Sequence, residues 1–215
     1  MKFSPHQGAL VHLALPDGTV IGRDDHRLGV ISAWIRATAH LFAFKRVLDL
    51  GSNCGHFPIV YRDLGAEVVA VEPNEQNVAV FRGLLGVLGA ERVTILQEDL
   101  RRVDFAALGA FNVLSTIGLI YHLNRPWEAM AAILRATGAS LWLVESTLWP
   151  EVSEVREGGG TPDCAFGPEQ VLHPTEAEVE RGIRECGFIP TRINLGPTYR
   201  SDDKTPRGFW IARRA

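Results

Sequence analysis

A regular alternation of strand and helix patterns begins at Lys45 and continues through most of the 215-residue chain. Short runs rich in Val, Ile and Leu alternate with longer segments whose apolar residues recur every three or four positions. Strands that are apolar on both faces and are separated by helices predict a parallel sheet covered on both sides. The expected strands are 46–51, 67–73, 92–100, 111–118 and 140–147, and the expected helices are 56–66, 74–89 and 125–138.

The N-terminal part of the chain has a different pattern. Residues 9–22 place apolar residues on both sides of a Pro-Asp-Gly turn, which predicts a small hairpin. Asp24 and Asp25 stand at N-cap positions ahead of helical spacing over 28–42. We therefore expect residues 1–44 to form a hairpin and helix that cap the core.

The C-terminal part predicts the edge of the same sheet. A helix over 175–187 precedes two strand candidates, 189–196 and 208–214, whose short separation is typical of an antiparallel pair. The preceding connection, 148–174, is longer than a routine loop and predicts a lid or substrate loop within a core domain of residues 45–215. Its candidate wall residues are Trp149, Phe166 and His173, with glycines 158–160 as a flexible point.

Composition limits the class of protein. The net charge of -3 argues against wrapping nucleic acid by charge alone, although it leaves room for a local basic patch. The three cysteines show no CxxC spacing, so neither a disulfide framework nor a metal site is expected, and a reducing cytoplasm fits. No leader pattern and no run of roughly 20 apolar residues is found, so no membrane association is expected. The oligomeric state stays open, a homodimer included.

The stretch "VLDLGSNCG" runs from the first core strand into a glycine turn, Asp49 to Gly55. In an open α/β sheet, ligands bind at the carboxyl ends of strands, and this turn supplies the close backbone approach. The glycine spacing does not match a pyrophosphate fingerprint, and no Lys-Ser/Thr pair follows for a phosphate loop. Asp49 would repel a pyrophosphate but could face a cationic amino group.

Two further strand ends carry carboxylates. Glu72 follows the second core strand and is suited to accept hydrogen bonds from ribose hydroxyls. Asp99 lies near the end of the third and could accept one from an exocyclic adenine amine. A ligand that fits all three contacts joins a nucleoside to an amino-acid tail and has no phosphate. That ligand is S-adenosylmethionine (SAM). The expected SAM-binding residues are Asp49, Gly51, Ser52, Asn53, Gly55, Glu72, Pro73, Asp99, Leu100 and Gly118.

These motifs carry a family resemblance. "VLDLGSNCG", "VVAVEPN" and "LQEDL" resemble the first three motifs of class I SAM-dependent methyltransferases. The resemblance implies an α/β, Rossmann-like, seven-stranded and mostly parallel sheet, with helices on both faces and one antiparallel edge strand. One departure is Asn53, which stands where the middle glycine of the turn is usual. Asparagine tolerates a left-handed backbone better than most residues, so we expect the turn to be retained.

The reacting end of the site is expected after the fourth core strand, in "IGLIYHLNRP". Tyr121 and His122 fall just past the carboxyl end of that strand. A histidine titrates near working pH and could act as general base toward an acceptor, or it could only shape the turn. Both roles stay open, because methyl transfer from a sulfonium often needs only positioning.

A narrower resemblance rests on "GLIYHLNRP", "LVEST", "RECGF" and "PRGFWIARR". They are similar to the subgroup containing the tRNA wobble-uridine carboxymethyltransferase, which uses carboxy-SAM. The resemblance implies that Tyr121 and Arg207 contact the extra carboxylate, a group that a guanidinium binds well. Glu145 is expected at the end of the fifth core strand. It could orient a substrate donor or Arg207, or it could only form a salt bridge within the end of the sheet. Only Met1 to Phe44 precedes the core, whereas the tRNA enzyme has a long N-terminal extension.

The sequence thus predicts a SAM-dependent methyltransferase that acts on a small-molecule acceptor by direct attack on the sulfonium methyl. Tyr121, His122, Glu145 and Arg207 are expected to face the reacting group. One alternative is a cyclase or lyase that acts on the SAM side chain and releases methylthioadenosine. Others are a tRNA-modifying (carboxy)methyltransferase and a non-catalytic SAM-binding subunit.

Overall fold

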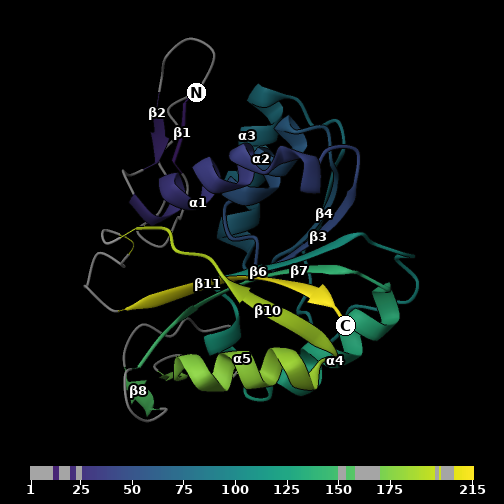
Figure 1. Ribbon diagram of the computed structural model, residues 1–215. Coiled ribbons are helices and arrows are strands. Elements are labelled where there is room, and N and C mark those ends of the chain that lie inside the picture. The colour runs from purple at the N-terminus through teal and green to yellow at the C-terminus, as the bar shows by residue number, and fades with distance from the viewer. Residues whose placement is uncertain are drawn as a thin grey trace. The chain divides into compact units, whose positions relative to one another are not determined.

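The computed structural model describes residues 12–14, 20–22, 26–149, 154–157, 170–196, 199 and 206–215 (Figure 1). The chain divides into two compact units, Met1–Val103 and Asp104–Ala215. The described strands form one seven-stranded sheet and two small two-stranded sheets.

The first unit contains the beginning of the strand-helix alternation. Its elements are β1 (His12–Ala14), β2 (Val20–Gly22), α1 (His26–Ala37), the 3-10 helix η1 (Ala39–Leu41), β3 (Arg46–Leu50), α2 (His56–Asp63), β4 (Glu67–Val71), α3 (Glu75–Leu88) and β5 (Val93–Leu96). Strand β4 pairs in parallel with both β3 and β5. The short strands β1 and β2 pair antiparallel, as the Pro-Asp-Gly pattern predicts.

Local signals explain where the helices of this unit begin. Asn74 caps the start of helix α3, and its side chain accepts hydrogen bonds from the backbone N–H groups of Gln76 and Asn77. A buried apolar cluster packs α2 and α3 on the strands, and it contains Cys54, Ile59, Ala70, Phe81, Leu84 and Leu85. Burial of a large aliphatic or aromatic side chain stabilises a fold by roughly 1.5–3 kcal/mol, so such clusters dominate the free energy of folding.

The second unit completes the sheet. Its elements are β6 (Val113–Ile117), the 3-10 helix η2 (Ile120–His122), α4 (Pro126–Thr137), β7 (Leu141–Thr147), β8 (Glu154–Glu157), β9 (Gln170–His173), α5 (Glu176–Glu185), β10 (Phe188–Arg192) and β11 (Arg207–Arg214). Strands β6 and β7 pair in parallel. Strand β11 runs antiparallel to both β7 and β10.

The strand order of the large sheet is β10-β11-β7-β6-β3-β4-β5. The predicted mostly parallel sheet is confirmed, together with its antiparallel pairing at one edge. β11 is the strand that reverses direction, and β10 forms the edge beside it. All seven residues of β7 are buried, which explains why the strand begins with four apolar residues; its last three, Glu145 to Thr147, are polar.

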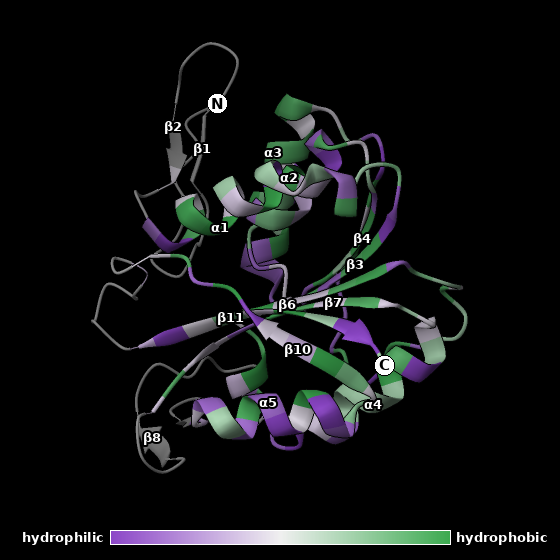
Figure 2. Cartoon of the chain, in the orientation of Figure 1, coloured by the Kyte–Doolittle hydropathy of each residue, from purple (hydrophilic) through white to green (hydrophobic). Residues whose placement is uncertain are grey.

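Helix α5 shows why a polar segment folds against this edge. Thr175 and Glu178 form a capping box, in which each side chain bonds the other residue's backbone N–H. Hydrophilic residues dominate the helix in Figure 2, while Val179, Gly182 and Ile183 are its buried positions. A Cβ at Gly182 would lie 2.1 Å from Trp127 of α4, so the two helices approach closely there.

Two expectations need correction. The helix expected over 28–42 ends at Ala37 and continues as the 3-10 turn η1, and the Thr38 hydroxyl donates to the Trp34 carbonyl at this change. The connection 148–174 is not wholly irregular, because it contains the antiparallel pair β8 and β9. Gly158 to Gly160, Phe166, Asp24 and Asp25 lie outside the described residues. The division at residues 44 and 45, and the lid role of 148–174, remain predictions.

Candidate functional site

The glycine turn after β3 is held by its own backbone. The N–H groups of Gly51 and Ser52 donate to the Val71 carbonyl at 2.9 and 3.2 Å, which ties the turn to the end of β4. Asn53 has a φ of 48°, so the predicted left-handed backbone at this position is confirmed. Gly55 has a φ of 84°, and a Cβ there would lie 2.1 Å from the Phe81 ring. Glycine is therefore required at Gly55 by both conformation and space.

Glu72 is fixed beside this turn. Its side chain is buried and accepts hydrogen bonds from the backbone N–H of Asn53 at 2.8 Å and of Asn74 at 3.1 Å. The Asn77 side-chain amide adds a third at 2.9 Å. The carboxylate follows the carboxyl end of β4, the position expected for a ribose-binding acid.

Two further polar groups belong to the turn region. Asp49 is buried near the end of β3. Ser52 is also buried, and its Oγ has no hydrogen-bond partner among the described residues. Buried hydroxyls are nearly always hydrogen-bonded in folded proteins, so a ligand that bonds Ser52 would complete the turn. A buried acid, which can face an ammonium group, and an unsatisfied hydroxyl, which can bond a carboxylate, fit a zwitterionic amino-acid tail such as that of SAM.

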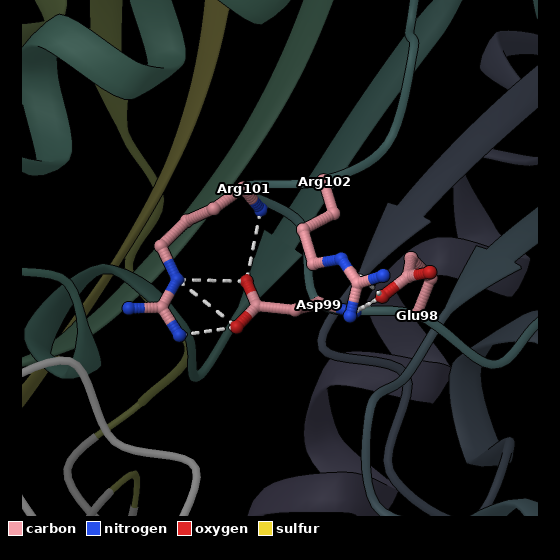
Figure 3. A network of polar contacts seen from close by, with 4 residues as sticks. All are labelled: Glu98, Asp99, Arg101 and Arg102. Atoms are coloured by element: carbon pink, nitrogen blue, oxygen red, sulfur yellow. Dashed lines mark hydrogen bonds and ion pairs between the residues drawn. The ribbon is translucent and has the colours of Figure 1, made fainter.

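The predicted adenine contacts lie after β5. Asp99 accepts hydrogen bonds from the Arg101 guanidinium, and Arg102 pairs with the neighbouring Glu98 at 3.6 Å (Figure 3). The hydrogen bonds from Arg101 hold the pKa of the Asp99 carboxyl below its usual value. Asp99 is therefore an ionised acceptor that Arg101 already engages. Leu100 is half-buried, and Pro73, which follows Glu72, is exposed.

In the second unit, a buried ion pair joins β7 to β11. The Arg207 guanidinium contacts both oxygens of Glu145, the second at 3.0 Å from Nη2. Glu145 is fully buried and Arg207 nearly so. Although burial disfavours the charged guanidinium, the carboxylate beside it raises the pKa of Arg207 well above its usual value. The structure thus joins Glu145 to Arg207, one of the arrangements that the sequence left open.

Tyr121 completes this contact from η2. Its hydroxyl accepts a hydrogen bond from Arg207 Nη2 at 2.9 Å, and the guanidinium lies 5.3 Å from the ring centroid. The chain enters η2 through Gly118, whose φ is 78° and whose N–H donates to the Glu145 carbonyl at 3.2 Å. Within this unit, hydrogen bonds therefore connect four of the predicted site residues, Gly118, Tyr121, Glu145 and Arg207.

His122 packs beside Tyr121, with 4.3 Å between the ring centroids and 45° between the ring planes. Burial, followed by the charges of Arg207 and His173, lowers the pKa of His122 to about 4. The imidazole is therefore neutral at pH 7, but such a low pKa makes it a weak proton acceptor. His173 is itself buried, and its ring centroid lies 6.2 Å from that of Trp149.

Two residues of this group were missed by sequence reasoning. Tyr199 is buried, and its hydroxyl donates to Glu145 at 2.9 Å. In the sequence, a lone aromatic residue before the charged run of residues 200–207 was the only signal. Thr147 lies two residues beyond Glu145 on β7, directly opposite Arg207 in the strand pairing. Its buried Oγ1 has no hydrogen-bond partner among the described residues.

Comparison with known proteins identifies the family. A family model described as a methyltransferase domain matches residues 24–166, more than half of the chain. Among curated proteins, the chain is 40% identical over 153 residues to the ribosomal RNA small subunit methyltransferase A of Anaeromyxobacter dehalogenans, covering 67% of this chain and 52% of that protein. It is 24% identical over 186 residues to the tRNA U34 carboxymethyltransferase of Klebsiella pneumoniae, covering 83% and 54%. The chain thus spans about half the length of these relatives.

Solved structures share the fold. The N-terminal domain of EvdMO1 with S-adenosylhomocysteine (SAH) bound superposes with a TM-score of 0.73 at 20% identity, covering 97% of this chain and 92% of that one. The 1,6-didemethyltoxoflavin-N1-methyltransferase of Burkholderia thailandensis, solved with 1,6-didemethyltoxoflavin and SAH, gives 0.68 at 19% identity, covering 89% and 80%. Together with the family match, they confirm the predicted class I fold. The chain belongs to the methyltransferase-domain family of SAM-dependent enzymes.

Proposed function

We propose that this enzyme transfers the methyl group of SAM to a small-molecule acceptor. The observation that carries SAM binding is the turn itself, where a left-handed Asn53 donates its N–H to the buried Glu72 and Ser52 presents an unsatisfied hydroxyl. Asp49 and the backbone of the turn from Gly51 to Gly55 hold the methionine end, and Glu72 holds the ribose. Asp99 and Leu100 hold the adenine. When bound, SAM supplies an electrophilic methyl group on its sulfonium sulfur, and the neutral thioether SAH is a good leaving group.

The second unit supplies the groups that act on the acceptor. Tyr121, held by Arg207, orients the acceptor through its hydroxyl, and Glu145 keeps Arg207 charged and fixed. His122, neutral at pH 7 and weakly basic, contributes mainly shape and a hydrogen bond. The proposed chemistry therefore favours an acceptor atom that is already nucleophilic near neutral pH, because no strong base is provided.

The charge distribution supports a small molecule over RNA. Surface arginines of the described chain are repeatedly neutralised by adjacent acids, among them the pairs Arg46–Glu67, Arg125–Glu128 and Arg184–Glu180. An RNA-binding surface needs uncompensated positive charge to engage phosphates, and the whole chain carries a net charge of -3. The solved relative with a bound heteroaromatic acceptor also supports this choice.

RNA modification is the second candidate, and the names of the two curated relatives favour it. It also retains the carboxylate role of Tyr121 and Arg207 that the narrower resemblance implies. On this alternative, the chain binds tRNA or rRNA with an affinity that falls steeply as salt rises. The salt dependence of RNA binding therefore separates the two candidates.

The cofactor part of the proposal is tested by calorimetry with SAH. Glu72→Ala removes the proposed ribose acceptor and is expected to weaken binding at least tenfold, about the value of one or two lost hydrogen bonds to a charged group. Glu67→Ala, at the exposed start of the same strand, is the matched control and leaves the affinity unchanged. Thermal unfolding of both variants establishes that they are folded. Unchanged affinity in Glu72→Ala, or no SAH binding by the unaltered protein, would sink the proposal.

The acceptor part is tested by incubation with radiolabelled SAM. Transfer of label into a small-molecule fraction of cell extract supports the proposal, whereas transfer into RNA supports the second candidate. SAM without extract is the third arm, and release of methylthioadenosine there would show that the enzyme acts on SAM alone.

A further inference from the structure

The contact between Asp99 and Arg101 bears on how the purine is recognised. Oδ1 of Asp99 accepts hydrogen bonds from the Arg101 backbone N–H and from Nε, both at 2.9 Å. Oδ2 accepts from the same Nε at 3.0 Å and from Nη2. A carboxylate has about four lone-pair positions, two on each oxygen, and three N–H groups of Arg101 occupy most of them, with the Nε–H shared between the two oxygens. Figure 3 shows the guanidinium lying side-on to the carboxylate.

The ion pair of Asp99 and Arg101 can separate at little cost. The Arg101 side chain is 68% exposed and Asp99 is 28% exposed, so the guanidinium can move into solvent without leaving a charge buried. An exposed ion pair of this kind contributes little to stability, because solvent and salt screen it. The backbone N–H of Arg101 would stay on Oδ1 and keep the turn in place.

We propose that Arg101 is a specificity-determining residue for the purine, because an amine at purine position 6 has to displace its guanidinium from Asp99. This inference rests on the proposed function, in which Asp99 accepts from the adenine amine. The amine replaces a charged donor with a neutral one, so the guanidinium lowers the affinity for SAM and SAH. A purine with a carbonyl oxygen at position 6 is repelled by Asp99 but can accept from Arg101. Arg101 therefore also reduces the ratio by which the site prefers a 6-amino purine over a 6-oxo purine.

The neighbouring pair offers a matched control. Arg102 and Glu98 form a second exposed pair one residue along, at 3.6 Å, and Arg102 is 76% exposed. Arg102→Gln removes the same charge from the same turn, and it leaves the contacts between Arg101 and Asp99 intact. A general electrostatic effect on the ligand would appear in both variants, whereas competition for Asp99 appears only in Arg101→Gln.

The test is calorimetric titration of the full chain with SAH and with its 6-oxo analogue S-inosylhomocysteine. Arg101→Gln is expected to bind SAH about two- to fivefold more tightly, the range of an exposed ion pair, and to prefer SAH over the analogue by a correspondingly larger factor. Arg102→Gln is expected to match the unaltered protein. Raising salt from about 0.05 M to about 0.5 M narrows the gap between Arg101→Gln and the unaltered protein, since salt screens the competing pair.

Unchanged or weaker SAH binding in Arg101→Gln would overturn the inference, and so would an equal gain in Arg102→Gln. Weaker binding would mean that Arg101 holds Asp99 in place for the ligand. Failure of the proposed function is recognised separately, because the unaltered protein would then bind no SAH at all.

Discussion

The two units hold the carboxylates Glu72 and Glu145 in different ways. Glu72 directly follows β4, and Glu145 lies within β7, two residues before its end, so the predicted place of Glu145 at the strand end needs a small correction. Glu72 accepts hydrogen bonds from amide groups 2, 5 and 19 residues away in the chain. Glu145 meets a tyrosine and an arginine that lie 54 and 62 residues away, and that arginine meets Tyr121 at a separation of 86. The polar contacts of Glu72 in the first unit join residues close together in the sequence. Those of Glu145 in the second unit join residues far apart in the sequence.

The difference has an energetic side. Each hydrogen bond from a neutral amide to Glu72 contributes a modest net stabilisation, because on folding it replaces a hydrogen bond to water. The ion pair of Glu145 and Arg207 is far more sensitive to loss of one partner, because the other charge is left buried. Changes in the second unit should therefore cost more free energy of unfolding than changes in the first.

The largest expected effect is that of Arg207→Met. Loss of the guanidinium leaves Glu145 buried and uncompensated, which we expect to lower the free energy of unfolding by about 3–5 kcal/mol. Arg192→Met is the control, since Arg192 forms an exposed pair with Glu176 and should cost at most about 1 kcal/mol. Denaturant unfolding measures both, and the double variant Arg207→Met/Glu145→Leu should recover much of the loss. Equal losses of unfolding free energy in Arg207→Met and Arg192→Met would contradict the proposed difference between buried and exposed pairs.

The next effect is a pH dependence carried by His122. Its pKa in the folded protein is about 4, below the ordinary 6.5, so the unfolded chain binds more protons between these values. Stability therefore rises with pH across that window, and up to about 3 kcal/mol is lost as pH falls from 6.5 to 4. His122→Gln should flatten this slope, whereas the exposed His40→Gln should not. Unfolding measured from pH 4 to 7 is the check, and an unchanged slope in His122→Gln would contradict it.

The smallest effect concerns the turn of the first unit. Asn53→Val places a β-branched residue at a φ of 48° and is expected to cost about 1–2 kcal/mol of unfolding free energy. Asn53→Gly should stay within about 0.5 kcal/mol of the original, because glycine adopts this conformation without strain. Thermal unfolding of both variants measures the difference. A valine variant as stable as the glycine variant would show that the backbone conformation is not limiting.

Much of the first unit could be predicted from the sequence because its signals are local. The glycine turn, the left-handed Asn53 and the position of Glu72 all follow from residues close together in the chain. The predicted role of Asp99 was less complete, since the guanidinium two residues later is a flexible side chain that no pattern places. In the second unit, hydrogen bonds join Gly118, Tyr121, Glu145 and Arg207, all of them predicted site residues. Their roles remain predictions, and Tyr199 and Thr147 were not predicted.

The sequence by itself determined the order of the α-helices and of the strands of the large sheet, the turn after β3 and the family, because hydrophobic periodicity and short motifs act over a few residues. The small pair β8 and β9 was not predicted. Only the tertiary structure decided that Arg207 faces Glu145, that Tyr199 reaches the same carboxylate and that His122 loses its basicity. These outcomes depend on the antiparallel return of β11 beside β7 and on burial. Pairing and desolvation between distant segments exist only once the chain has folded, so no local pattern encodes them visibly.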